Sequence, residues 1–126
     1  MDNKHAADAV LAVDDDPSVL RLLGRVFSEH GIACETVPDP PAAARALAER
    51  SYSLILLDVM IPGFSAAGNV RLLRERAPEV PILLMTGGAD EAVIDAARAA
   101  GAEGPVRKPF DCERLLGTVR SLLGSA

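Results

Sequence analysis

Two unbroken apolar runs, at residues 54–57 and 82–85, constrain the fold of this chain more than any other feature. A strand with one wet face alternates apolar and polar residues, whereas an unbroken run suits a strand covered on both faces. Further apolar segments lie at residues 10–13 and, more weakly, at 105–107. Residues 33–37 alternate instead, which indicates an edge strand that is wet on one side. The pattern predicts a mostly buried parallel sheet.

Helical sequence patterns fill the stretches between these strands. The first expected helix begins with Asp16 and Pro17, an N-cap followed by proline at the first helical position, and Gly31 follows its end. Ser65 is a candidate cap ahead of the third helix. The expected helices cover residues 17–30, 41–50, 69–76, 90–100 and 113–123. Strict alternation of strand and helix predicts an α/β domain whose parallel strands are joined by right-handed crossovers.

Length, charge and composition exclude several classes of protein. At 126 residues the chain is expected to form a single domain over 1–126, with a core at about 9–123. Its net charge is −5, whereas a domain that binds nucleic acid directly usually carries a basic surplus. No stretch reaches the roughly 18 apolar residues of a membrane span, and the start lacks a signal-peptide pattern. Cys34 and Cys112 have no metal-ligand spacing. We expect a cytoplasmic domain with neither membrane nor nucleic acid as a direct partner.

Polar side chains follow four of the expected strands, at the sheet edge where open α/β folds bind ligands. Each has an ordinary structural explanation on its own, as a cap, a turn or a solvated loop residue, but their recurrence at successive strand ends favours one shared site. The residues are Asp14, Asp15 and Asp16 after the first strand, Asp58 after the third, Thr86 and Gly87 at the end of the fourth, and Lys108 after the fifth.

The charges of these residues indicate phosphoryl chemistry. Asp16 is expected to serve as the helix cap, which leaves Asp14, Asp15 and Asp58 in one small pocket. Two carboxylates about 4 Å apart repel by about 4 kcal/mol at an effective dielectric of 20, so the group must hold a proton or a cation. Mg²⁺ takes such oxygen ligands. With Lys108 and Thr86 opposite, the set forms a clamp for a transferring phosphoryl group.

Four segments together resemble the receiver domain of two-component response regulators. They are residues 11–18 (LAVDDDPS), 54–63 (LILLDVMIPG), 84–87 (LMTG) and 106–110 (VRKPF), and the resemblance runs from about residue 10 to 123. It implies a bacterial, cytoplasmic signalling domain with a three-layer (βα)₅ flavodoxin-like fold and a five-stranded parallel sheet in the order 2-1-3-4-5. It also implies that the domain is a phosphoprotein and not an enzyme acting on external substrates.

The resemblance implies a role for each site residue. Asp58 would be the phosphoacceptor, taking its phosphoryl group from a histidine kinase or a histidine phosphotransfer protein. Mg²⁺, with Mn²⁺ as a substitute, would be bound directly by Asp15 and Asp58, mainly through water by Asp14, and by the backbone carbonyl of Met60. A monomer is expected, because the fourth helix, around residues 96–100, is rich in alanine and has few charges.

The switch residues implied by the resemblance are Thr86, Gly87 and Lys108. Thr86 and Lys108 would each contact a phosphoryl oxygen, and Gly87 would leave room above it. A cis peptide is implied between Lys108 and Pro109. A downstream protein would read the change at the surface of the fourth helix, the fifth strand and the fifth helix.

The chain departs from the family pattern at three places. Pro105 stands where receivers usually carry a Tyr or Phe three residues before the lysine, so the signal is expected to pass through the backbone. The loop at residues 64–67 lacks the usual acidic residue and glycine. Met60 and Gly88 stand where many relatives have polar groups, which predicts slow self-dephosphorylation.

Three other functions stay open from the residues alone. A pseudo-receiver would share the fold but bind partners without phosphorylation. A haloacid-dehalogenase-type phosphatase would need a second acid two residues after its nucleophile, where this chain has Met60. A flavodoxin-type cofactor module would need a first loop that accepts phosphate, and three acids occupy that loop.

Overall fold

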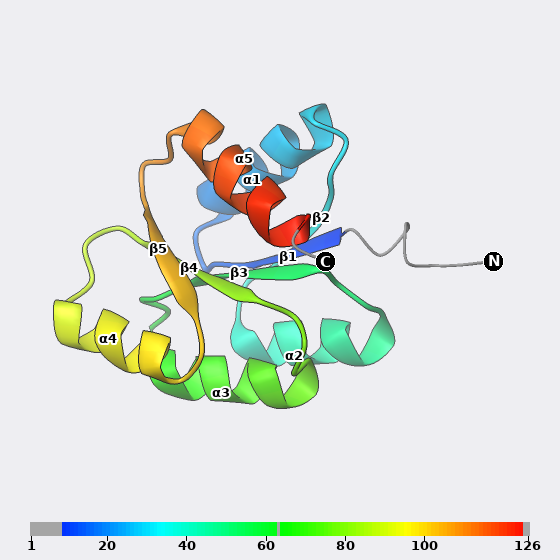
Figure 1. The fold of residues 1–126 in the computed structure, drawn as a ribbon. Coiled ribbons are helices and arrows are strands. Elements are labelled where there is room, and N and C mark those ends of the chain that lie inside the picture. The colour runs from blue at the N-terminus through cyan, green and yellow to red at the C-terminus, as the bar shows by residue number, and fades with distance from the viewer. Residues whose placement is uncertain (1–8, 63, 125–126) are drawn as a thin grey trace.

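A computed structural model describes residues 9–62 and 64–124 of the chain (Figure 1). Expectations that concern residues 1–8, 63 and 125–126 lie outside the described residues. Five strands alternate with five helices in these ranges, as the sequence predicts. The strands are β1 (Ala9–Val13), β2 (Ala33–Val37), β3 (Leu54–Asp58), β4 (Ile82–Thr86) and β5 (Glu103–Arg107). The helices are α1 (Pro17–Glu29), α2 (Pro40–Glu49), α3 (Ala66–Arg76), α4 (Glu91–Ala99) and α5 (Cys112–Leu123).

The strands form one parallel sheet in the order β2-β1-β3-β4-β5. The predicted (βα)₅ flavodoxin-like topology is therefore confirmed. Helices α1 and α5 cover one face of the sheet, and α2, α3 and α4 cover the other (Figure 1). Because all strands run the same way, the segments that follow them gather at one edge of the sheet.

Alternate residues of the central strands build two separate cores. Residues such as Ile55, Leu57 and Leu84 point toward α2, α3 and α4. Their neighbours, including Leu56 and Met85, point toward α1 and α5. Every residue of β3 and β4 is buried. This two-sided burial explains why these strands appear in the sequence as unbroken apolar runs.

The two edge strands differ from the sequence expectation in detail. Strand β2 lies at the predicted edge, but its burial does not alternate cleanly, since Ala33 and Thr36 are exposed and Cys34 and Glu35 are partly covered. Strand β5 begins at Glu103, two residues earlier than expected. Its pairing with β4 shifts register between Leu83 and Met85, so β5 is irregular as well as exposed.

Side-chain caps set several helix starts. Asp16 accepts a hydrogen bond from the Ser18 amide at 2.9 Å, which confirms it as the cap of α1. Ser65 accepts from the Gly68 amide at 3.0 Å and caps α3 as suggested. Because this cap acts earlier than the periodicity indicates, α3 begins at Ala66 and not at residue 69. In the described part of the chain, no helix has the length and apolar character required to cross a bilayer.

Candidate functional site

Asp14 and Asp58 stand next to each other at the carboxyl edge of the sheet. Parallel pairing matches Val13 of β1 with Leu57 of β3, so the residues that follow come side by side. The Asp14 residue is 0% exposed and Asp58 is 4% exposed. Asp15, the next residue along, is exposed to solvent. Asp14 and Asp58 are therefore buried, whereas Asp15 is in contact with solvent.

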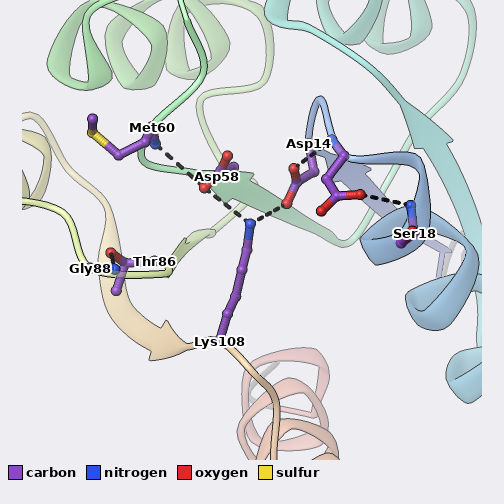
Figure 2. Close-up of polar contacts among 8 residues, drawn as sticks. Asp14, Ser18, Asp58, Met60, Thr86, Gly88 and Lys108 are labelled. Atoms are coloured by element: carbon purple, nitrogen blue, oxygen red, sulfur yellow. Dashed lines mark hydrogen bonds and ion pairs between the residues drawn. The ribbon is translucent and has the colours of Figure 1, made fainter.

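Lys108 is the cation of this site. Its Nζ lies 2.6 Å from Asp14 Oδ2 and 3.4 Å from Asp58 Oδ1 (Figure 2). The backbone amide of Lys108 donates to the Thr86 carbonyl at 2.8 Å, which continues the β4–β5 pairing beyond β5. The contact of Lys108 with Asp14 joins residues that are 94 positions apart in the chain. The ammonium group therefore bridges the two buried carboxylates.

Backbone amides also donate hydrogen bonds to both buried carboxylates. Asp14 Oδ1 accepts from the Asp16 amide at 3.0 Å, so both oxygens of Asp14 are engaged. Asp58 Oδ1 accepts from the Met60 amide at 3.4 Å. Figure 2 shows the carboxylates of Asp14 and Asp58 meeting at the ammonium group of Lys108, with the Met60 side chain directed away from it. That side chain is 58% exposed and offers no polar group to the site.

The pKa of Asp58 lies above its usual range. Burial contributes most, and the charge of Asp14 adds to it, while Lys108 and the Met60 amide act in the opposite direction. The pKa of Lys108 is also raised: burial would lower it, but the hydrogen bond to Asp14 and the charges of both carboxylates outweigh burial. The pocket thus has more negative charge than one ammonium group compensates.

The acidic residues fit a hard divalent cation. Carboxylate oxygens of Asp14, Asp15 and Asp58 all lie within 4.8 Å of one another. Opposite ligands of one Mg²⁺ are separated by about 4.2 Å, twice its usual bond length to oxygen. Small side-chain movements would let these oxygens share one ion. The structure thus brings the three acidic residues together, and their role as metal ligands stays a prediction.

Thr86 lies at the end of β4, 1% exposed. Its hydroxyl oxygen accepts from the Gly88 amide at 3.2 Å and from the Ala89 amide at 2.9 Å. In the described structure this hydroxyl therefore bonds to the loop before α4 and not to Asp58 or Lys108 (Figure 2). A β-carbon added at Gly87 would lie 3.9 Å from Lys108 Cδ, so Gly87 borders the same space.

One predicted feature beside the site is confirmed, and one feature was not foreseen. The Lys108–Pro109 peptide is cis, as the resemblance implied. Both Cys34 and Cys112 are free, and burial raises the pKa of Cys34 to about 12, which makes this thiol a poor nucleophile. The Gly104–Pro105 peptide is also cis, next to a Gly104 with φ of +97°.

Sequence reasoning missed how the loops are fixed. The bonds from the loop amides to Thr86, and from the Asp16 amide to Asp14, were not predicted. The available signal was the tendency of Asp and Thr side chains to bond backbone amides two or three residues later. That tendency is common in turns, so it does not by itself indicate a functional site.

Comparisons with known proteins agree with the fold. The family model of the response regulator receiver domain matches residues 10–120. The DNA-binding response regulator MtrA of Mycolicibacterium smegmatis is 34% identical over 114 residues, which is 90% of this chain and 50% of that protein. The transcriptional regulatory protein TcrA of Mycobacterium tuberculosis is 34% identical over 115 residues, 90% of this chain and 45% of TcrA. The chain spans about half the length of these relatives.

Solved structures of receiver domains have a similar fold. The chemotaxis protein CheY4 of Vibrio cholerae superimposes with a TM-score of 0.83 at 28% identity, covering 90% of this chain and 97% of that one. A CheY-like receiver domain protein of Methanospirillum hungatei reaches a TM-score of 0.87 at 20% identity, covering 94% of each chain, and so supports the fold. From the family match and the shared architecture, this chain belongs to the receiver domain family of two-component response regulators.

Proposed function

We propose that this domain accepts a phosphoryl group on Asp58 from a phosphohistidine of a histidine kinase or histidine phosphotransfer protein. The observation that carries the proposal is the position of Asp58, buried at the end of β3 and 3.4 Å from the ammonium group of Lys108. A carboxylate oxygen of Asp58 would attack phosphorus, forming the new P–O bond as the P–N bond to imidazole breaks. The released imidazole takes up a proton, and an aspartyl phosphate remains.

The acidic pocket would hold Mg²⁺ during this transfer. Asp15, Asp58 and the Met60 carbonyl would be direct ligands, with Asp14 acting mainly through water. When bound, the ion would compensate charge on the phosphoryl oxygens. Asp14 and its partner Lys108 are already held at 2.6 Å, so Asp14 also orients the ammonium group. Lys108 would then pair with a phosphoryl oxygen of the product.

The switch would run from Thr86 to α4 through the backbone. Thr86 accepts hydrogen bonds from the amides of Gly88 and Ala89, so its own hydroxyl hydrogen can be donated. A phosphoryl group on Asp58 adds up to about two negative charges and attracts that donor. Movement of Thr86 would then pull the loop that leads into α4. This route needs no aromatic residue at the position of Pro105.

The proposed phosphoacceptor role also implies a partner surface and limits for the domain. The surface of α4, β5 and α5 would change with phosphorylation and be read by a downstream protein. The domain is proposed to extend over residues 1–126 and to act as a monomer in the cytoplasm. MtrA is named as DNA-binding, but the net charge of −5 supports the view that this domain does not itself contact DNA.

Intact mass spectrometry tests the phosphoacceptor. Incubation with acetyl phosphate and Mg²⁺ should add about 80 Da, the mass of one phosphoryl group. Asp58→Ala should show no gain, and the exposed Asp95→Ala should gain the same mass as the unaltered protein. Chelation of the metal should also prevent the gain.

Other outcomes of that experiment would contradict the proposal. An unaltered protein that gains no mass would favour a pseudo-receiver, and a gain in Asp58→Ala would place the phosphoryl group elsewhere. Sustained hydrolysis of a generic phosphate ester would favour the phosphatase alternative. Met60 stands where that enzyme class needs an acid, and its thioether has no proton to give.

We expect the phosphorylated form to be long-lived. Hydrolysis needs a water oriented over the phosphoryl group, and neither Met60 nor Gly88 offers a polar side chain for this. The decay of the added mass after removal of acetyl phosphate measures the lifetime. A lifetime on the order of seconds would contradict this expectation. Met60→Asn, which supplies a polar side chain at that position, should shorten the lifetime.

A further inference from the structure

A hollow of about 370 Å³ lies between β5 and α5, and its lining includes none of Asp14, Asp15, Asp58 and Lys108. Its apolar lining includes Leu83, Pro105, Val106 and Pro109. Gly104 also lines the hollow, where a β-carbon would lie only 3.0 Å from Leu83 Cδ1 and so has no room. The volume falls within the range of about 300–1,000 Å³ that is usual for ligand pockets. We call this feature, lined also by Arg107 and Arg114, the β5–α5 hollow.

Two exposed arginines lie at the β5–α5 hollow. Arg107 comes from the end of β5 and Arg114 from the first turns of α5. Within residues 9–62 and 64–124, neither guanidinium group has a hydrogen bond or an ion pair. Asp111 is also in the lining, but its Oδ1 accepts from the amides of Glu113 and Arg114 at 3.1 and 3.3 Å. Its charge is therefore partly offset by the helix terminus.

We propose that the β5–α5 hollow binds an acidic segment of a partner protein, with one aromatic or large aliphatic side chain on the apolar lining and carboxylates on Arg107 and Arg114. The inference rests on the proposed function in one respect, namely that the occupant is the downstream partner. Arginine forms paired hydrogen bonds with carboxylates. A single apolar anchor surrounded by polar contacts is a usual arrangement in protein recognition.

Charge and shape favour this occupant over other anions. Inorganic phosphate would satisfy the arginines but leave the apolar lining in contact with water. A nucleic acid would bring many charges toward Asp111 and toward a domain with a net charge of −5. An acidic peptide with one apolar side chain matches both parts of the surface.

Peptide titration followed by NMR tests the proposal. The probe is the peptide acetyl-Asp-Glu-Phe-Asp-Glu-amide, added to the ¹⁵N-labelled protein. We expect saturable shifts of the amides of Gly104, Val106 and Thr118, with a Kd of about 1 mM or tighter. Replacing the phenylalanine of the peptide by serine, or its acids by lysine, should each weaken binding by about tenfold or more.

Matched protein variants separate this site from general charge effects. Arg107→Glu combined with Arg114→Glu should weaken binding by about tenfold or more. Arg45→Glu combined with Arg71→Glu makes the same charge change on exposed positions of α2 and α3 and should leave binding unchanged. Thr118→Phe on the exposed surface of α5 should fill the hollow and weaken peptide binding, although both arginines are kept.

Several results would overturn the proposal. These are no saturable shifts at up to about 5 mM peptide, equal shifts with acidic and basic peptides, and equal shifts with inorganic phosphate or a short single-stranded oligonucleotide. The mass gain with acetyl phosphate is measured on the same samples. A protein that binds the peptide but gains no mass contradicts the phosphoacceptor role and not the peptide site, whereas a protein that gains mass but binds no peptide contradicts only the peptide site.

Discussion

Strand β3 at the centre of the sheet and strand β5 at its edge carry the two charged groups that meet in the site. All five residues of β3 are buried, whereas none of the residues of β5 is fully buried. Asp58 ends a strand that is paired on both sides, while Lys108 follows a strand that is paired on one side with a shifted register. The acceptor is therefore fixed by the core, and its cation reaches in from a less constrained segment. The segment that carries Lys108 can therefore shift while Asp58 stays in place.

The largest expected effect comes from shortening a side chain in the central strand. Leu56→Ala should lower the free energy of unfolding by about 3–4 kcal/mol, because it leaves a cavity in a fully buried position. Val106→Ala in β5 removes a partly covered side chain and should cost about 1 kcal/mol. Urea denaturation of both variants measures the difference. Equal losses would show that β5 is as firmly packed as β3.

A smaller loss is expected when the cation is removed. Lys108→Met should lower the free energy of unfolding by about 2 kcal/mol, because two buried carboxylates lose their shared partner. The loss should shrink when Asp58 is also changed to Asn, since one of the two charges is then absent. Chemical denaturation of the four proteins in this double-mutant cycle measures the coupling. Strict additivity would contradict the bridging role of Lys108.

Removing one acidic charge should stabilise the metal-free protein. Burial and Asp14 raise the pKa of Asp58, so the folded state holds its proton more tightly than the unfolded chain does. The ionised carboxylate therefore costs stability above its raised pKa, and this cost disappears as the pH falls below the ordinary value of about 3.9. Asp58→Asn should therefore raise the free energy of unfolding at neutral pH.

Thermal melts against pH, with the metal chelated, measure this effect. The gain of Asp58→Asn over the unaltered protein should grow as the pH rises through the raised pKa and then stay constant. Added Mg²⁺ should stabilise the unaltered protein more than the variant, because binding to the folded state raises its stability. A variant that melts lower at every pH would show that Asp58 stabilises the fold.

The smallest effect on stability is expected at the boundary of the phosphoryl space. Gly87→Ala should change the free energy of unfolding by less than about 0.5 kcal/mol, because the added carbon meets Lys108 Cδ at an ordinary contact distance of 3.9 Å. Phosphorylation by acetyl phosphate should nevertheless slow by about tenfold if the added carbon displaces the incoming group. Unchanged kinetics would show that Gly87 is not needed for access.

The sequence predicted the central elements better than the edges. Residues 54–57 and 82–85 are apolar throughout because both faces of β3 and β4 are covered, and that requirement is visible in any window of the sequence. The first turn of α3 was missed because its residues, Ala66 to Gly68, carry no apolar periodicity and depend on the Ser65 cap. The start of β5 was missed because Gly104 and Pro105 are unusual strand residues.

The sequence by itself determined which chemical groups this protein presents, because strand ends in a parallel sheet must meet at one edge, and the acids, Thr86 and Lys108 all follow strands. Only the tertiary structure decided how they are connected. Lys108 lies between Asp14 and Asp58, the Thr86 hydroxyl is bound by loop amides, and Asp15 alone of the acidic cluster faces solvent. These relations depend on register, side-chain direction and distances between residues far apart in the chain, which no local pattern of amino acids encodes.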